Sequence, residues 1–586
     1  MSTRIGTWLS FCCLLLVTGC VTEDRYPTRG AAGITAEIQY RPAIDSTPSY
    51  VPINFPPVSY NGQELPLGKM SGHFPVLEVF LTNHREQPVE FSRVFLDGEE
   101  LKSFPNDKIV WWQLYPTAVA NAGETVLLQI CFDRNPSAPQ TLELEAKHGE
   151  RLALRAPTFV KPPCEIVGVN FDWDMRRAFI AYLPAQPSKS AARPHLVPRT
   201  VRFNGKDHRR SVRVMETPVE NRPGMIAADL GAPVAIGQPI HCRMEFAGGK
   251  VAQCLLRASK GISLDAYGVD QKDEKLRTEL GLGLHPPAWQ LGEDVACYDQ
   301  PQRPGYNAPS VLENRRKAYE AGDARLASVF LCVMARPQIS FPIYGQCTDV
   351  LQVNPYRLQY SGRDTAPKFI EKEENFFRWA WLAARPRPWH WAPEVCLFHK
   401  RKFGRIIEPQ ELRLLTYAAL GNGTKGVNYF AYGKFEGEYE GFQESPPLLA
   451  EIKKLNSEIK ILEPILSHAF SMSIQTISDD VTGTRLYTLW SGDEGVLLIA
   501  RSLAYETSRQ PNELGQKPQF RSSAPASVEV EASLPSWLQL TEVVDPLDPT
   551  ASPISHRVEG RKIVIAIPLK GGVGVAWLKN RRTKTD

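Results

Sequence analysis

Short apolar runs separated by turn residues follow one another through the first 160 residues of the chain. They occupy residues 76–81, 89–96, 109–114, 125–132 and 141–146. The run at 89–96 closes on Asp97 and Gly98, a pair that favours a tight turn between antiparallel strands. Regular spacing of this kind predicts a β-sandwich over residues 36–160.

A second series of strand-like runs extends over residues 161–258. Its apolar runs include residues 166–171, 178–182 and 200–203. In both series one strand ends in an Asp-Gly or Asn-Gly turn, and a proline followed by a glycine precedes a later long strand. We therefore predict two immunoglobulin-like β-sandwiches in tandem.

Between residues 259 and 470, strand-like runs alternate with amphipathic helical patterns. The strand candidates occupy residues 295–299, 328–333, 349–354, 389–398 and 426–432. Helical stripes begin near Ser310, Pro409 and Pro446, and the last of them is expected to end before Pro464. This alternation predicts a parallel sheet closed into a TIM-type (β/α) barrel.

The pattern returns to strands over residues 471–586, which predicts a C-terminal β-sandwich. Counting back from 426–432 as the eighth barrel strand makes 295–299 the fourth. Residues 259–294 must then supply all the strand–helix units that precede the fourth strand, although one such unit takes ~30 residues. We expect a multidomain chain whose barrel is truncated in its front half.

Charge and composition narrow the range of functions. Lysine and arginine total 68 and aspartate and glutamate 64, a net charge of +4. The basic residues are dispersed, so we expect no nucleic-acid partner. No histidine or cysteine cluster has metal-ligand spacing and no glycine-rich phosphate loop occurs, so we expect neither a metal nor a cofactor.

The first residues have the pattern of an export signal. Arg4 precedes an apolar run over residues 9–17, which closes on the sequence Val17-Thr18-Gly19-Cys20. This resembles the bacterial lipoprotein signal, and the resemblance implies that residues 1–19 are removed and that Cys20 carries the lipid. Alternatives are an ordinary secretory signal or a membrane-spanning anchor, for which the run is too short. Residues 20–35 would be a tether, and Val21 after the cysteine favours the outer membrane or the cell surface.

Eight of the eleven cysteines would remain thiols or form disulfides after removal of the signal and lipidation of Cys20. An even number in an exported chain permits disulfides without assigning them. Cys242 and Cys254 flank Gly248 and Gly249, and they could face each other across a hairpin with a three-residue loop. Most of the others lie in apolar runs and are expected to be buried thiols.

Three segments in the second half of the chain resemble one enzyme family. They are Tyr298-Asp299-Gln300-Pro301, residues 349–356, and residues 411–430. With them, residues 259–580 resemble the β-galactosidase-like (β/α)-barrel glycoside hydrolases and their trailing β-domain. The resemblance implies a catalytic carboxylate pair after strands four and seven, of the kind that stand ~5–5.5 Å apart in retaining enzymes. The acid/base position would hold Gln300, beside Asp299, and an amide cannot donate that proton.

Glu394 is the candidate nucleophile. Period-two alternation places His390, Ala392 and Glu394 on one face of their strand and Trp389 and Trp391 on the other. A loop carboxylate paired with Arg385 or Arg387 is the alternative. Trp379, Trp381, Trp389 and Trp391 could be sugar platforms but are expected to be core. The expected substrate-binding residues are Tyr298, Asn354, Tyr356, His390, Asn428 and Tyr432.

Two functional hypotheses follow. The first is an exported, membrane-anchored lipoprotein that binds an oligo- or polysaccharide and has weak or lost hydrolase activity. The second is an active retaining glycosidase with Glu394 as nucleophile and Gln300 in place of the acid/base. Plant myrosinases, which belong to the same clan, use glutamine there because their aglycone leaves without protonation. The shortened front half of the barrel favours the first hypothesis.

Overall fold

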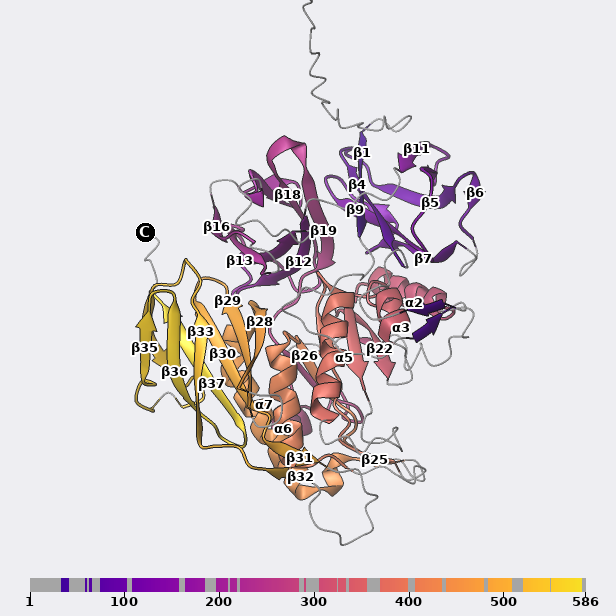
Figure 1. Cartoon of the computed structure of the whole chain (residues 1–586). Coiled ribbons are helices and arrows are strands. Elements are labelled where there is room, and N and C mark those ends of the chain that lie inside the picture. Colours follow the sequence, from indigo (N-terminus) through magenta and orange to yellow (C-terminus); the bar gives the residue numbers. More distant parts are fainter. Residues whose placement is uncertain are drawn as a thin grey trace, which may run out of the picture.

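Three β-rich modules surround one parallel sheet flanked by helices in the computed structural model (Figure 1). The structure describes residues 33–41, 58–60, 63–65, 74–102, 108–156, 164–184, 196–208, 211–218, 222–283, 289–290, 305–323, 325–332, 337–355, 369–398, 406–434, 439–478, 483–507, 520–548 and 550–581. No helix in these ranges is long and apolar enough to span a membrane.

The first module is an antiparallel sandwich with its core between two sheets, as the turn spacing predicts. One sheet consists of β1 (Ile34–Arg41), β4 (Val76–Asn83), β9 (Thr125–Phe132) and β7 (Ile109–Tyr115). The other consists of β11 (Arg151–Ala156), β10 (Gln140–Ala146), β5 (Val89–Leu96), β6 (Glu99–Glu100) and β8 (Val119–Ala120). The short strands β2 (Val58–Tyr60) and β3 (Gln63–Leu65) pair separately.

The second module is also an antiparallel sandwich, and it lies beside the first (Figure 1). One sheet contains β12 (Cys164–Phe171), β13 (Arg177–Pro184), β17 (Gly224–Asp229) and β16 (Val212–Glu216). The other contains β15 (Lys206–Asp207), β14 (Thr200–Phe203), β18 (Pro239–Glu245) and β19 (Val251–Arg257). Both predicted N-terminal sandwiches are therefore present.

A six-stranded sheet forms the centre of the molecule, and all of its pairings are parallel. Its spatial order is β20 (Ser263–Ala266), β26 (Gly426–Tyr429), β24 (Trp389–Trp391), β23 (Val350–Asn354), β22 (Ala327–Cys332) and β21 (Trp289–Gln290). The first strand in sequence thus lies beside the last, which is the neighbour relation required of a barrel.

The sheet differs from the expected barrel at two points. The strand beside β22 is β21, six residues before the predicted fourth strand at 295–299, and that predicted strand lies outside the described residues. No pairing joins β20 to β21 in the described part of the chain, so a closed barrel is not shown. Residues 267–288, which hold the short helix α1 (Glu274–Glu279), are too few for two further strand–helix units.

Helices pack against this sheet and one another. Helices α6 and α7 start at the predicted residues, whereas α2 starts at Ala308 and the predicted cap Ser310 lies inside it. Their bounds are α2 (Ala308–Glu320), α3 (Pro337–Tyr344), α5 (Phe369–Ala384), α6 (Pro409–Gly421) and α7 (Pro446–Leu466). Glu408 and Glu411 form a capping box at the start of α6, with Pro409 in its first turn. Helix α7 extends past Pro464 to Leu466, at least three residues beyond the expected end.

The C-terminal module is the third sandwich. Its larger sheet contains β28 (Ala469–Ile477), β29 (Thr484–Ser491), β30 (Gly495–Ser502), β37 (Val573–Asn580) and β34 (Leu540–Val544). The smaller sheet contains β33 (Ser527–Ser533), β36 (Lys562–Pro568) and β35 (His556–Glu559). Strands β31 (Tyr505–Thr507) and β32 (Phe520–Ser522) pair separately.

One buried carboxylate connects both N-terminal sandwiches to the central sheet. Asp349 accepts hydrogen bonds from the Tyr115 hydroxyl at 2.7 Å, from the Arg257 guanidinium at 2.9 Å and from the Ala327 backbone N–H at 2.8 Å. Tyr115 ends β7 and Arg257 ends β19, whereas Ala327 begins β22. Burial opposes ionisation of Asp349, but Arg257 and Arg315 hold its pKa below the usual value.

Replacing Asp349 by asparagine should destabilise the protein, because a cluster of buried guanidiniums would lose its carboxylate. We expect a loss of ~3–5 kcal/mol at neutral pH, measured by thermal unfolding. Since the folded-state pKa is lowered, the carboxylate stabilises the protein above the unfolded value of ~3.9. This contribution disappears as the pH falls through the folded-state pKa, so the variant and the wild type should converge in acid.

Glu313→Gln is the matched control, because Glu313 pairs with Arg316 on the exposed surface of α2. Its effect should stay within ~0.5 kcal/mol. Equal losses in the two variants, or a difference that does not depend on pH, would contradict the role given to Asp349.

Candidate functional site

The strand register separates the two faces of the parallel sheet. Trp389 stacks on Phe377 of α5 with 5.5 Å between ring centroids, and the indole N–H of Trp391 donates to Glu373 of the same helix at 3.2 Å. Both tryptophans therefore face the helical layer and are core residues, as predicted. His390, between them in sequence, faces the opposite side of the sheet, which we call the inner face.

The residues of the inner face are mostly polar. Paired residues of adjacent strands share a face, so Gln352 and Phe330 lie with His390 at one level. Trp391 pairs with both Val353 and Val427, which places the next residues, Asn354 and Asn428, together one level higher. Two of the predicted substrate-binding residues are thus brought to the same height, and Asn354 is 0% exposed.

Asp265 of β20 completes this level because it pairs with Asn428. Its carboxylate accepts from Arg277 of α1 at 2.9 Å and from the amide of Gln271 at 3.1 Å. The side-chain oxygen of Asn428 is buried, and no described residue donates a hydrogen bond to it. An acceptor left in this state within a polar face is suited to a ligand hydroxyl.

His390 is held by a close fit against Gly426. A Cβ atom added to Gly426 would lie 2.6 Å from Cγ and Nδ1 of the imidazole, so only glycine leaves room for the ring. Burial lowers the pKa of His390 to about 3. The imidazole is therefore neutral at physiological pH and can exchange hydrogen bonds with a ligand but does not supply a positive charge.

Glu394 lies at the carboxyl end of the inner face. It forms a parallel bridge with Phe430, one level above Asn428, and is 7% exposed. Arg385 binds Glu165 at 3.0 Å, and Arg387 binds the carbonyls of Gln346 and Thr348. The alternative that Glu394 pairs with one of these arginines is therefore wrong.

An aromatic cluster covers this end of the sheet. The Phe430 ring lies 5.0 Å from that of Tyr267, 6.3 Å from that of Phe330 and 5.8 Å from that of Tyr439. Tyr439 belongs to β27 (Tyr439–Glu440), which pairs antiparallel with β25 (Leu397–Phe398). Tyr267 is 41% exposed, so this member of the cluster is accessible from solvent.

The other predicted site residues have different outcomes. Tyr432 lies just beyond β26, and its ring packs 5.3 Å from that of Phe442, which begins a short 3-10 helix (Phe442–Glu444). Cys20, Tyr298, Asp299, Gln300 and Tyr356 lie outside the described residues.

Sequence reasoning missed Asp265 and Tyr267, because β20 is only four residues long and its partner strand is distant in sequence.

The position of β21 also changes which carboxylates follow the strand beside β22. The first ones after it in the sequence are Glu293 and Asp294, which lie outside the described residues. The sequence signal for strand β21 was the pair of apolar residues Trp289 and Leu291, just before these carboxylates. Within the described ranges no group of three His, Cys, Asp or Glu could hold a metal ion.

No protein-family model and no curated protein matches the chain. Among solved structures, it is similar to a β-galactosidase from the psychrophilic Marinomonas ef1, with 16% identity over 27% of this chain and 26% of that one, at a TM-score of 0.22. A structure described as a glycoside hydrolase has 12% identity over 51% and 65%, at 0.31.

A GH2 β-galacturonidase from Eisenbergiella tayi has 10% identity over 72% of this chain and 98% of that one, at a TM-score of 0.23. The chain thus spans about a quarter of the first of these enzymes and less than two thirds of the second. The structural neighbours are glycoside hydrolases at low identity, and such TM-scores define neither substrate nor activity for this chain.

Gly426→Ala should disturb the inner face, because the added methyl group must displace the His390 ring. We expect a loss of ~1–3 kcal/mol in stability, measured by thermal unfolding, since the surrounding strands leave little room for the ring to move. Gly433→Ala is the control, because a Cβ atom there would meet nothing within 4 Å. If both variants unfold at the wild-type temperature, the close fit has been misjudged.

Proposed function

We propose that this chain binds carbohydrate on the inner face of a glycoside-hydrolase-like, truncated (β/α) barrel, and that its hydrolase activity is weak or lost. The observation that supports this most is the arrangement at the carboxyl ends of the parallel strands. Asn354, Asn428 and Asp265 share one level there, directly below Glu394. Active sites of parallel barrels lie at this end.

The chemistry of these residues suits a sugar. Amide and carboxylate groups exchange hydrogen bonds with ring hydroxyls, and an aromatic ring such as Tyr267 can stack on the apolar face of a pyranose. Three described polar groups converge within a mostly buried face, which is the usual composition of a small-molecule site. A neutral His390 adds a further donor and acceptor without charge.

Loss of hydrolysis is proposed because no carboxyl group is assigned to the acid position of the retaining pair. Such a pair needs a second carboxyl group that can protonate the leaving group. The family resemblance gives this position to Gln300, and removal of a general acid typically costs ~10²–10⁴ in rate. The shortened segment between β20 and β21 also removes loops that would form subsites.

An active retaining glycosidase is the second candidate, and the position of Glu394 favours it. A retaining glycosidase needs its nucleophile at the end of the seventh barrel strand, and Glu394 lies at the end of the strand that resembles it. With Gln300 at the other position, only substrates with good leaving groups would react.

Glu394→Gln distinguishes the two functions when both binding and turnover are measured. For a binding protein we expect no turnover of natural oligosaccharides by the wild type. The variant should bind the best ligand from an oligosaccharide panel ~10–100-fold more weakly by calorimetry, because hydrogen bonds to a charged group are lost. For a glycosidase, wild-type release of nitrophenol from activated aryl glycosides should disappear in the variant.

Glu440→Gln is the matched control, because this carboxylate lies on the covering strand β27 and pairs with Lys434 at 3.5 Å. It should leave ligand affinity within a few-fold of wild type. Gln300→Glu and Asp294→Asn complete the series. A gain of turnover in the first supports the acid position of Gln300, whereas a loss in the second assigns the acid to Asp294. Wild-type turnover that survives Glu394→Gln would exclude both functions at this face.

We further propose that the mature chain is exported and anchored to the bacterial cell envelope by a lipid on Cys20, at the outer membrane or cell surface. The support is the sequence Val17-Thr18-Gly19-Cys20 after a short apolar run.

Cys20→Ala should prevent lipid attachment and move the protein from the membrane fraction to the soluble fraction. Metabolic labelling with a fatty acid measures the attachment. Cys12→Ala is the control. Labelling that persists without Cys20 would refute the anchor.

A further inference from the structure

Two cysteines of the second sandwich lie opposite each other in the β18–β19 hairpin. Cys242 and Cys254 are paired residues of the antiparallel ladder, and the turn between the strands is the three-residue segment Ala247–Gly249. The sequence-based expectation for this hairpin is therefore confirmed. Both cysteines are thiols in the structure.

The hydrogen-bond pattern fixes the spacing of the two backbones. Phe246 N–H donates to the Lys250 carbonyl at 2.8 Å near the turn, and Ala258 N–H donates to the Gln238 carbonyl at 2.9 Å at the far end. Because hydrogen-bonded pairs alternate along an antiparallel ladder, Cys242 and Cys254 also form such a pair, with Cα atoms ~5.5 Å apart. Disulfides most often join Cα atoms ~5.5–6 Å apart.

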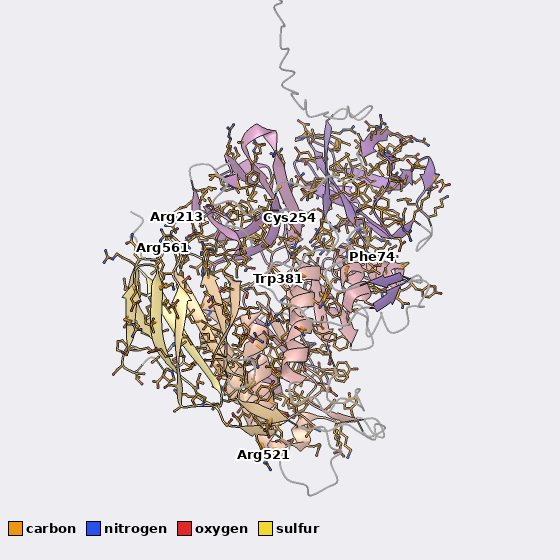
Figure 2. The ribbon with its side chains drawn as sticks, viewed as in Figure 1. Phe74, Arg213, Cys254, Trp381, Arg521 and Arg561 are labelled. Carbon is orange, nitrogen blue, oxygen red and sulfur yellow. The ribbon has the colours of Figure 1, made fainter. Side chains whose placement is uncertain are left out.

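The surroundings decide which thiols can react. Cys242 and Cys254 are buried in the core of the sandwich, and β19 is the edge strand of its sheet. Cys164, on the opposing sheet, lines the same small cavity as Cys254. This cavity lies between the sandwiches and the amino ends of the parallel strands, which we call the base of the central sheet. Figure 2 labels Cys254 close to this junction. Cys164 is therefore the competing partner.

We propose that Cys242 and Cys254 are a modification site, oxidised to a disulfide within the hairpin by thiol–disulfide exchange with a small-molecule disulfide or a disulfide oxidoreductase. One cysteine loses its proton and attacks the oxidant, which forms a mixed disulfide and releases one thiolate. The second cysteine then loses its proton and attacks the mixed disulfide, which releases the other thiolate. Two electrons and two protons leave the protein, and the oxidant is reduced to two thiols.

The disulfide forms during folding and not in the folded protein. The thiolate is the attacking species, and burial raises the pKa of Cys242 and of Cys164, so few thiolates exist once the core has formed. The bond would hold the edge strand β19 against β18. That strand ends at Arg257, whose guanidinium binds Asp349 at the base of the central sheet.

The test uses the full chain, purified under reducing conditions, unfolded, and refolded with a mixture of reduced and oxidised glutathione. We expect the intact mass to fall by about 2 Da for the one bond. Peptide mapping should show one linked peptide that contains Cys242 and Cys254. Reduction should then lower the thermal unfolding temperature by a few degrees.

Cys164→Ser is the matched control and should keep this linked peptide, whereas Cys242→Ser should lose it. If a variant fails to fold, oxidation of the wild type without prior unfolding provides a second readout. It should proceed at least ~10-fold more slowly than during refolding, because the thiols are buried. A link between Cys164 and Cys254, or recovery of fully reduced folded protein from the oxidising mixture, would overturn the proposal.

Discussion

The arrangement of the molecule depends on burying one carboxylate among several guanidiniums. Asp349, just before β23, is 2% exposed, and a charged group buried to this extent is costly unless it is paired and hydrogen-bonded. Its partners come from the ends of β7 and β19 and from the start of β22. Arg315 and Arg387 also stack on the Tyr115 ring, at 4.7 and 4.1 Å from its centroid. The two N-terminal sandwiches are thus fixed to the amino ends of the strands, opposite the candidate site.

This division leaves the carboxyl ends of the strands for ligand recognition. Polar residues at the base connect modules, whereas those of the inner face, Asn354, Asn428 and Asp265, gather at the other end. The C-terminal sandwich is joined by a different buried cluster, in which Arg501 of β30 binds Glu371 and Glu374 of α5. The C-terminal sandwich is therefore held by ion pairs separate from the contacts of Asp349, and neither group of contacts lies on the inner face.

The sequence allowed the sandwiches, the starts of α6 and α7 and the face of β24 to be predicted, because these depend on local patterns. Alternation placed Trp389 and Trp391 opposite His390, and Pro409 with Glu411 marked the start of α6. Long-range pairing has no local signal, so the two-residue strand β21 and the four-residue strand β20 were missed. Asp349 belongs to a segment singled out by the family resemblance, yet no pattern indicated Tyr115 and Arg257 as its partners.

The pairing of β20 with β26 has a consequence for how the protein folds. Ser263 and Gly426 are neighbours in the sheet but are separated by most of the central module in sequence. Closing so long a loop is entropically expensive, and contacts of this kind slow folding. We therefore expect the segments between them to collapse first and β20 to dock late. Asp265 would reach Asn428 only in that step, so the complete inner face is a marker of the last stage of folding.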